Sequence, residues 1–334
     1  MELDEFLCLS YPLLNKGFLR RQIRAGNILV DGNGALPNLR LKNDQVLIVD
    51  IDESEGLPAA PVAPRAEVPV LYEDDDVLVV DKPAGLAVEP ERWARGEACL
   101  AGALLELSLD RAGLERAEEP GAAHEGLGFR PRLVHRIDKE TSGLVLVAKH
   151  LESERRQRTA FEAGEIDKAY LALVEGEYPL DDGESEVLDL PIAPDRRRTG
   201  RMQVSEKGGK PSQTRVSVEQ RFRGYTLMRC SPITGRTHQI RVHMCDVGFP
   251  LCVDGLYGRR DQFFLSEIKS SYRLKPGRTE QPLIDRLTLH AYELEFPAAN
   301  ERVRVRAELP RDFQRVLKQL SKVRAPRPNR GWRS

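Results

Sequence analysis

The sequence lacks the patterns that mark membrane insertion, secretion and disulfide frameworks. Its 334 residues contain no apolar run of the length that spans a bilayer. The first residues, Met-Glu-Leu-Asp-Glu, have no basic region followed by an apolar one, so we expect no secretory signal and a cytoplasmic protein. The five cysteines are odd in number and form no C-x-x-C pair, which favours reduced thiols.

Metal-binding spacings are absent as well. The six histidines include no H-E-x-x-H, and the five-residue spacing of His238 and His243 does not align two ligands on one helix face. We therefore expect no metal site. The hydrophobic content of 40% and the charged content of 31% are those of an ordinary globular protein, and the length allows one sizeable domain plus a smaller one.

The chain also has no excess of positive charge. Its 51 Lys and Arg against 52 Asp and Glu give a net charge of −1, which alone argues against a nucleic-acid partner. The charges are nevertheless segregated. Residues 16–24 carry four basic residues and no acid, residues 195–215 carry seven against two acids, and the tail from 321 carries five and no acid. Such runs can present a basic face to phosphates, although each run taken singly is more often a solvated face.

Residues 1–50 are expected to form a small separate unit. Phe18 to Ala25 has the pattern of a short basic helix that ends at Gly26, and short strands are expected at 28–30 and 46–49. This order resembles the S4 RNA-binding module, whose helix and loop face structured RNA, although Phe-Leu-Cys replaces the usual opening Arg-Leu-Asp. The resemblance makes the basic residues of the helix RNA-binding candidates: Lys16, Arg20, Arg21 and Arg24.

A proline-rich stretch separates this unit from the rest. Residues 51–68 contain Leu-Pro-Ala-Ala-Pro-Val-Ala-Pro without apolar periodicity, which indicates an extended linker and a domain boundary. We expect the main domain over residues 69–320 and a basic C-terminal tail over 321–334. Within the main domain, residues 110–130 are rich in Ala, Glu, Gly and Arg and are expected to form a variable loop.

One stretch of the main domain combines a core strand with a carboxylate at its mouth. Leu144 to Ala148 is an apolar run that predicts a strand buried on both faces, and Thr141-Ser142-Gly143 predicts a tight turn before it. Asp138 therefore lies beside a turn, with Arg136 on the same side of an extended segment. A nearby cation favours the ionised form of a carboxylate, which a nucleophile requires. The alternative for an arbitrary Arg-x-Asp is a surface ion pair.

The residues around this carboxylate match a known motif. His135-Arg136-Ile137-Asp138, followed by Thr-Ser-Gly and the apolar strand, closely resembles the active-site motif of the RluA family of pseudouridine synthases. In that family the aspartate is the catalytic nucleophile, and the resemblance assigns this role to Asp138. It also makes His135 and Arg136 candidates for contacts with the substrate.

Two further stretches resemble motifs of this family. A strand expected at Val77 to Val80 leads into Lys-Pro-Ala-Gly, which borders the active-site cleft in the family and makes Lys82 a substrate-binding candidate. In the strand expected from Asp167 to Gly176, the Lys-x-Tyr context of Tyr170 matches the family's catalytic tyrosine, which stacks on the target base. Core packing is the alternative for a lone strand tyrosine.

A further family signature, and the second specific one, runs from Ser231 to His243 and contains Arg-Thr-His-Gln-Ile-Arg. Thr237 is the expected N-cap of a helix that carries Arg241 and ends at Gly248. In the resembling family this segment supplies an arginine paired with the nucleophilic aspartate, and we assign that role to Arg241. The other polar residues of the segment are structural or substrate-binding candidates: Arg236, His238 and Gln239.

The resemblance implies an α+β fold, with a long, mixed, mostly antiparallel sheet and a central cleft in the catalytic domain, plus the small S4-like domain. It implies a monomeric enzyme that isomerises specific uridines in structured RNA. The favoured substrate is 23S rRNA, and tRNA is the alternative. The N1–C1′ bond is cleaved and C5 is joined to C1′ without a redox step or a group donor, so no cofactor is expected. Asp138 attacks the ribose or the base, or removes a ribose proton, and the sequence leaves these routes open.

Two other classes of function compete with this interpretation. One is a non-catalytic RNA-binding or ribosome-assembly protein of the same fold, but Asp138, Tyr170 and Arg241 are all present. The other is a glycoside or nucleoside hydrolase, which typically uses two positioned carboxylates. The nearest second acid, Glu140, is expected to shape the turn instead.

Overall fold

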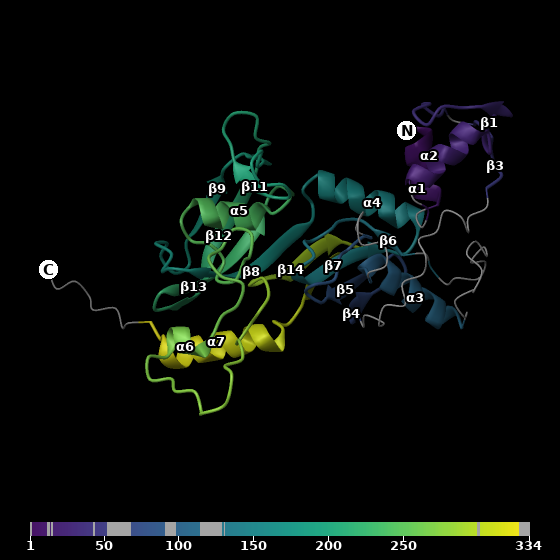
Figure 1. Cartoon of the computed structure of the whole chain (residues 1–334). Helices are drawn as coiled ribbons and strands as arrows, with labels where there is room; N and C mark the ends of the chain where they lie inside the picture. Colours follow the sequence, from purple (N-terminus) through teal and green to yellow (C-terminus); the bar gives the residue numbers. More distant parts are fainter. Residues whose placement is uncertain are drawn as a thin grey trace. The chain divides into compact units, whose positions relative to one another are not determined.

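The computed structural model describes residues 2–11, 14, 16–42, 44–51, 68–90, 98–113, 129, 131–298 and 301–326 (Figure 1). Nearly all of the expected linker, most of the loop expected over 110–130 and residues 327–334 of the expected tail lie outside these residues. The chain divides into two compact units, Met1–Ala66 with Glu89–Phe129, and Glu67–Val88 with Arg130–Ser334. Residues 89–129, expected inside the 69–320 domain, therefore group with the first unit.

The described part of residues 1–51 folds as helices followed by a small sheet. Its elements are α1 (Leu3–Ser10), α2 (Lys16–Ala25), β1 (Ile28–Val30), β2 (Asn33–Gly34) and β3 (Leu47–Val49), with the strands antiparallel in the order β2-β1-β3. Their apolar side chains share one core, and Gly26 ends α2 at a φ of 84°. The predicted basic helix and both strands are confirmed to within two residues, whereas α1 was not expected. The first unit also contains α3 (Leu100–Ala112).

The second unit is built on a ten-stranded sheet in the order β4-β5-β7-β14-β8-β13-β12-β9, with β15 paired to β14 and β6 paired to β7 (Figure 1). Its strands are β4 (Val70–Glu73), β5 (Val77–Lys82), β6 (Arg132–Leu133), β7 (Ser142–Ala148), β8 (Asp167–Glu175), β9 (Ser185–Asp189), β12 (Gln213–Phe222), β13 (Tyr225–Pro232), β14 (Leu289–Pro297) and β15 (Arg302–Arg306). Only β7 with β14 is a parallel pair among the described strands. The mixed, mostly antiparallel sheet is therefore confirmed.

Helices cover both faces of this sheet, and a separate hairpin pairs β10 with β11. These elements are α4 (Leu151–Glu162), β10 (Ile192–Pro194), β11 (Met202–Val204), α5 (Gln239–Asp246), α6 (Leu265–Ile268) and α7 (Arg311–Val323). Because side chains alternate along β8, Leu171 and Leu173 pack with α6 and α7, while Ala172 and Val174 pack with α5. Figure 1 shows α6 and α7 together on one side of the sheet and α5 on the other.

The core strand β7 starts earlier than the sequence indicated. Ser142 and Gly143, expected in a tight turn, are its first residues, and the turn lies at residues 139–140. Gly143 has a φ of 111° and pairs with Lys82 of β5 and Ala291 of β14. A Cβ at this position would lie 2.2 Å from the carbonyl oxygen of Ala291, so the glycine permits close strand pairing and does not form a turn.

Two helices also differ from expectation. The N-cap of α5 is His238 at a φ of 57°, and the prediction of Thr237 is wrong because the helix begins at Gln239. Helix α7 was not expected and continues into the stretch predicted as a basic tail. None of the described helices is both long enough and apolar enough to cross a membrane.

Candidate active site

The loop that carries Asp138 is held against the loop that leaves the neighbouring strand. The carbonyl oxygen of Asp138 accepts a hydrogen bond from the Thr141 N–H at 3.1 Å, which closes the turn before β7. The carbonyl oxygen of Lys139 accepts from the Gly85 N–H at 2.9 Å. Since β5 and β7 are paired as far as Lys82, these two loops stay side by side at the same end of the sheet.

Lys82 strengthens this link from the interior. Its side chain is fully buried, and its Nζ donates to the carbonyl oxygens of Pro83 at 2.9 Å, Leu86 at 2.7 Å and Lys139 at 2.9 Å. These bonds use all three donors of an ammonium group. Burial lowers the pKa of Lys82 to about 8, although nearby carboxylates oppose the shift. Lys82 therefore orients the loop that carries Asp138, and no donor remains for a substrate.

Arg241, from α5, is shared by two carboxylates. Its Nη1 donates to Oδ2 of Asp138 at 3.2 Å, while Nε and Nη2 donate to the two oxygens of Asp254 at 2.8 Å each. Asp254 is almost fully buried, and its Oδ1 also accepts the N–H groups of Leu256 and Tyr257. The planar guanidinium is thus fixed in orientation by Asp254 before it meets Asp138.

Asp254 and Asp138 differ in their burial, although both contact Arg241. Burial alone would raise the pKa of Asp254, but hydrogen bonds from Arg241 and its charge hold that pKa below the ordinary value. Burial likewise opposes the charge of Arg241, yet Asp254 and Asp138 raise the pKa of Arg241. The side chain of Asp138 is 25% exposed, against 8% for Arg241 and 0% for Asp254, so Asp138 is the group that a substrate can reach.

The carboxylate of Asp138 is held at one oxygen only. Both of its polar side-chain contacts within the described residues go to Oδ2, from Arg241 Nη1 at 3.2 Å and from His238 Nε2 at 3.9 Å. Oδ1 has no hydrogen-bond partner in that part of the chain. A carboxylate fixed at one oxygen and open at the other suits a nucleophile or a general base.

A hydrogen-bonded pair of rings lies next to this carboxylate. His238 Nδ1 is 2.8 Å from the hydroxyl of Tyr257, and the same hydroxyl accepts the Met202 N–H at 2.8 Å. The two rings meet edge to face with centroids 5.6 Å apart. The guanidinium of Arg241 lies over the Tyr257 ring, 5.0 Å from its centroid.

Tyr170 lies on β8 opposite Cys230 of β13 and Ala291 of β14. The residue is half-buried and packs against the core that contains Ala172 and Cys230, which is the core packing given as the alternative role. Its hydroxyl, however, has no hydrogen-bond partner among the described residues. Burial raises the pKa of Tyr170 well above its ordinary value, and the charge of Asp138 adds to the effect, so the phenol stays protonated in the field of that carboxylate.

The two residues next to Asp138 in the motif point elsewhere. The ring of His135 is 4.8 Å from that of Phe161, and its Nε2 accepts the Leu146 N–H at 2.8 Å. Burial lowers the pKa of His135 to about 3, so the ring is neutral and ties the loop to β7. Arg136 is exposed and, in the part of the chain that the structure describes, forms no ion pair, so the surface ion pair with Asp138 that was the alternative interpretation is absent there.

Gln239 and Arg236 belong to the turn before α5. The side-chain amide of Gln239 donates to the carbonyl oxygen of Gln213 and to Thr214 Oγ1, both at 2.9 Å, while its Oε1 accepts the Arg236 N–H at 3.0 Å. Buried Gln239 therefore fixes the start of α5 to β12 and thereby aims Arg241. Arg236 is exposed, and its Nε donates to the carbonyl oxygen of Pro211 at 3.1 Å.

The sequence analysis missed Asp254 and Tyr257, which lie in one loop after α5. The signal was present, because Asp254 is the only acid between Phe249 and Gly258. Gly258 permits the loop to close, since a Cβ there would lie 2.7 Å from the carbonyl oxygen of Asp254. What the sequence could not supply was the contact between Asp254 and the arginine on the preceding helix.

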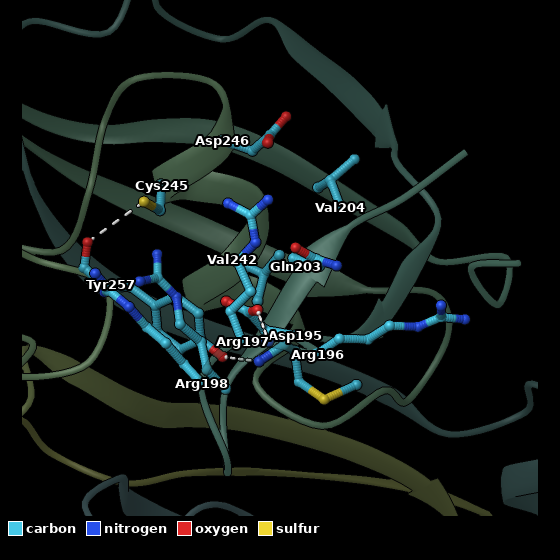
Figure 2. Close-up of a pocket in the computed structure, with 12 residues that line it drawn as sticks. Asp195, Arg196, Arg197, Arg198, Gln203, Val204, Val242, Cys245, Asp246 and Tyr257 are labelled. Carbon is cyan, nitrogen blue, oxygen red and sulfur yellow. Dashed lines mark hydrogen bonds between the residues drawn. The ribbon is translucent and has the colours of Figure 1, made fainter. Parts of the chain in front are cut away.

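Tyr257 also lines a basic pocket of about 670 Å³ (Figure 2). Its wall combines the hairpin of β10 and β11 with α5. Four arginines line it against the two acids Asp195 and Asp246: Arg196, Arg197, Arg198 and Arg201. The guanidinium of Arg201 is 5.1 Å from the centroid of the Tyr257 ring. The structure thus gathers four of the seven basic residues of 195–215 around one hollow.

Two of the four basic residues expected to bind RNA in α2 already have an acidic partner. Lys16 Nζ lies 3.3 Å and Arg20 Nη2 lies 2.7 Å from Oδ2 of Asp4, whose side chain is fully buried on α1. Arg21 and Arg24 are exposed, and neither forms an ion pair within the described ranges. The run that has no acid in sequence is therefore partly neutralised by an acid twelve residues before it.

The chain is similar in sequence and in fold to known proteins. A family model described as RNA pseudouridylate synthase matches residues 76–246. Ribosomal large subunit pseudouridine synthase C of Escherichia coli (strain K12) is 34% identical over 333 residues, which cover 96% of this chain and 93% of that protein. Ribosomal large subunit pseudouridine synthase D of Xanthomonas campestris is 33% identical over 327 residues, which cover 95% of this chain and 88% of that protein. The solved structure of human RNA Pseudouridylate Synthase Domain Containing 1 has a TM-score of 0.51 at 25% identity and covers 73% of this chain and 84% of that one.

Proposed function

Because this chain belongs to the RNA pseudouridylate synthase family, we propose that it isomerises specific uridines of 23S ribosomal RNA. Membership confirms the predicted RluA-family resemblance and the predicted RNA pseudouridine synthase activity. The choice of 23S rRNA is supported by the large-subunit relatives. The observation that carries the proposal is the carboxylate of Asp138, which Arg241 holds at Oδ2 and which has no hydrogen-bond partner at Oδ1 among the described residues.

In this proposal Asp138 acts through Oδ1 on a uridine that has left its stack. The N1–C1′ bond breaks, the uracil turns, and C5 is joined to C1′. Oδ1 attacks the ribose or the base, or removes a ribose proton, and each route starts from an ionised carboxylate. Arg241 holds Oδ2, and Tyr170 offers a ring on which the uracil stacks. Product and substrate have the same atoms and oxidation state, so no cofactor is required.

The RNA around the target uridine must be held while the base is extruded. The arginines between residues 196 and 201 are gathered on the hairpin next to α5, where they can contact backbone phosphates. Arg136 is exposed beside the reacting carboxylate and is available to RNA. In the first unit, α2 offers Arg21 and Arg24 to phosphates, which supports an S4-like role for this unit.

The competing functions fit the site less well. A carboxylate-based hydrolase needs a second acid that can give or take a proton near the first. Asp254 shares Arg241 with Asp138, but Asp254 is buried, accepts two hydrogen bonds from the guanidinium and has a lowered pKa that keeps it ionised. A purely RNA-binding protein would have no use for an aspartate that keeps one oxygen free beside a fixed arginine.

The test is a map of pseudouridines in 23S rRNA and in tRNA from cells with and without this protein. Loss of modification at defined 23S positions, restored by the wild type and not by Asp138→Asn, supports the proposal. Loss confined to tRNA would contradict the choice of 23S rRNA, and unchanged maps would refute the assigned activity. We further propose a monomer in the cytoplasm, which size-exclusion chromatography and cell fractionation check.

A further inference from the structure

The pair formed by His238 and Tyr257 has no role in the chemistry described so far. We infer that His238 is a positioning residue, which directs a neutral Nε2–H at Oδ2 of Asp138 and leaves Oδ1 as the reacting oxygen. The inference rests on the proposed function, because it assigns a role within the same reaction.

The hydrogen bonds of Tyr257 determine which ring nitrogen of His238 carries the proton. The backbone N–H of Met202 can only donate, so the Tyr257 oxygen accepts it at 2.8 Å. The hydroxyl hydrogen then needs an acceptor, and His238 Nδ1 lies 2.8 Å away. Nδ1 therefore accepts, and in a neutral imidazole the proton resides on Nε2. Nε2 is the nitrogen that faces Oδ2 of Asp138, at 3.9 Å.

The backbone at His238 is held in an unfavourable conformation. Its φ of 57° and ψ of 21° lie in the left-handed region, which is uncommon for residues other than glycine, although Asn, Asp and His adopt it more often than the rest. At this N-cap position the His238 side chain makes no capping hydrogen bond. Strain of this kind persists where the surroundings require a particular side-chain direction, and here that direction leads to Asp138.

Burial is the main reason that the ring of His238 is neutral. His238 is 17% exposed and lies among Asp138, Asp254, Arg241 and the hydroxyl of Tyr257, with Arg201 on the Tyr257 ring. Burial and the charge of Arg241 lower the pKa of His238, against the opposing effect of the two carboxylates. A neutral donor orients Oδ2 without adding a second full positive charge, which would stabilise the carboxylate and weaken it as a nucleophile.

The 3.9 Å between His238 Nε2 and Asp138 Oδ2 is longer than a hydrogen bond. The side chain of Asp138 is 25% exposed, so a substrate that covers it can bring the two atoms closer. A bound uridine excludes water from Asp138, and catalytic hydrogen bonds that are long in the free enzyme shorten at that stage. With Arg241 and His238 both on Oδ2, rotation of the carboxylate is restricted and Oδ1 is directed at the substrate.

Two substitutions of His238 separate its two nitrogens. His238→Gln places an amide N–H near the position of Nε2, whereas His238→Asn reaches only the position of Nδ1. Asn tolerates a positive φ better than Gln does, so backbone strain alone would favour His238→Asn. The positioning role predicts the opposite order. The measurement is release of tritium from C5 of labelled uridine in a 23S transcript, in single turnover, with thermal melting of each variant.

We expect His238→Gln to keep a saturated rate within about threefold of the wild type, and His238→Asn to be slower by about 10- to 100-fold at an unchanged KM. Equal rates for the two variants, or a change confined to KM, would overturn the inference. A wild type that releases no tritium would instead refute the proposed function.

A second measurement keeps the inference testable if His238→Asn fails to fold. Tyr257→Phe removes the hydroxyl that sets the tautomer and keeps the ring. We expect it to slow the wild type by about threefold or more, and to slow the His238→Gln variant less, because Gln has no tautomer to set. Loss of the Met202 partner is common to both backgrounds and cancels. Equal effects in the two backgrounds would refute the role given to Tyr257 and His238.

Discussion

Asp138 and Asp254 share the guanidinium of Arg241, but they differ in burial and in the number of hydrogen bonds that they accept. Asp254 is fully buried, and its oxygens accept two bonds from Arg241 and two backbone N–H groups. Asp138 is a quarter exposed and has contacts at Oδ2 only within the described residues. The same residue type is thus structural where both carboxylate oxygens accept hydrogen bonds, and it is the proposed reactive group where one oxygen has no such partner among the described residues.

This comparison also explains why one arginine serves both acids. The bidentate pair with Asp254 fixes the plane of the guanidinium, and Nη1 is left to face Asp138. A buried pair of this kind adds little net stability by itself, but removing one partner is costly. Its value lies in the fixed position of Nη1, which holds the carboxylate for the reaction.

The largest effect is expected for Asp138→Asn, which removes the reacting charge at nearly constant shape. Single-turnover tritium release should fall by about a thousandfold or more, since no other route to the covalent or proton-transfer step remains. The free energy of unfolding should change by less than about 1 kcal/mol, because the side chain is partly exposed and the contact of Arg241 with Asp254 survives. A variant that retains more than a few per cent of activity would remove Asp138 from its role.

The opposite pattern is expected for Asp254→Asn. The free energy of unfolding should fall by about 3 kcal/mol, because a buried arginine loses its charged partner. The saturated rate should fall by about 10- to 100-fold, since Nη1 is no longer held in place. Urea denaturation and single-turnover assays on this variant and on Asp138→Asn measure both quantities. If Asp254→Asn is as stable as the wild type, the proposed division between the two acids is wrong.

A smaller loss is expected for Lys82→Met, which removes the Nζ donor from the carbonyl oxygens of Pro83, Leu86 and Lys139, although the Lys139 oxygen keeps its bond from the Gly85 N–H. The free energy of unfolding at pH 7 should fall by about 2 kcal/mol, because unsatisfied acceptors outweigh the relief of a buried charge. The rate should fall less than for Asp254→Asn, since Lys82 acts on the loop and not on the carboxylate itself. An unchanged rate would show that Gly85 alone suffices to hold the loop.

The same variant tests the pKa of Lys82. Its pKa is lowered to about 8 in the folded state, against about 10.4 in an unfolded chain. Below pH 8 both states carry the charge. Between these values the unfolded state binds more protons, so stability contributed by this group rises with pH. The stability gap between wild type and Lys82→Met should therefore widen between about pH 8 and pH 10, by up to about 3 kcal/mol. A constant gap would mean that Lys82 titrates normally.

The smallest effect concerns α2, where paired and unpaired groups again differ. Arg21→Gln with Arg24→Gln should weaken binding to a 23S fragment and lower the salt slope by about one to two, because unpaired cations release counterions from RNA. Lys16→Gln with Arg20→Gln is the matched control. It should lower the salt slope less and should destabilise the first unit, since buried Asp4 loses both cations. Equal slopes for the two double variants would contradict this distinction.

Much of the fold and the site could be predicted from local patterns. The apolar run from Leu144 predicted a buried strand, and every residue of β7 is buried. Residue types around Asp138, Tyr170 and Arg241 indicated the family, because a motif records which side chains a reaction needs. The predicted start of β7 was wrong. Gly143 belongs to the strand because β14, almost 150 residues later in the sequence, approaches it too closely for a side chain.

The sequence by itself determined which carboxylate and which arginine we assign to the reaction, because backbone pattern and residue identity are local properties. Only the tertiary structure decided that Arg241 meets Asp138 across 103 residues, that Asp254 fixes the guanidinium, and that the His135 ring turns into the core. These contacts depend on how α5 packs on the sheet. That packing sums many weak apolar contacts between distant segments, and no short stretch of sequence encodes the sum.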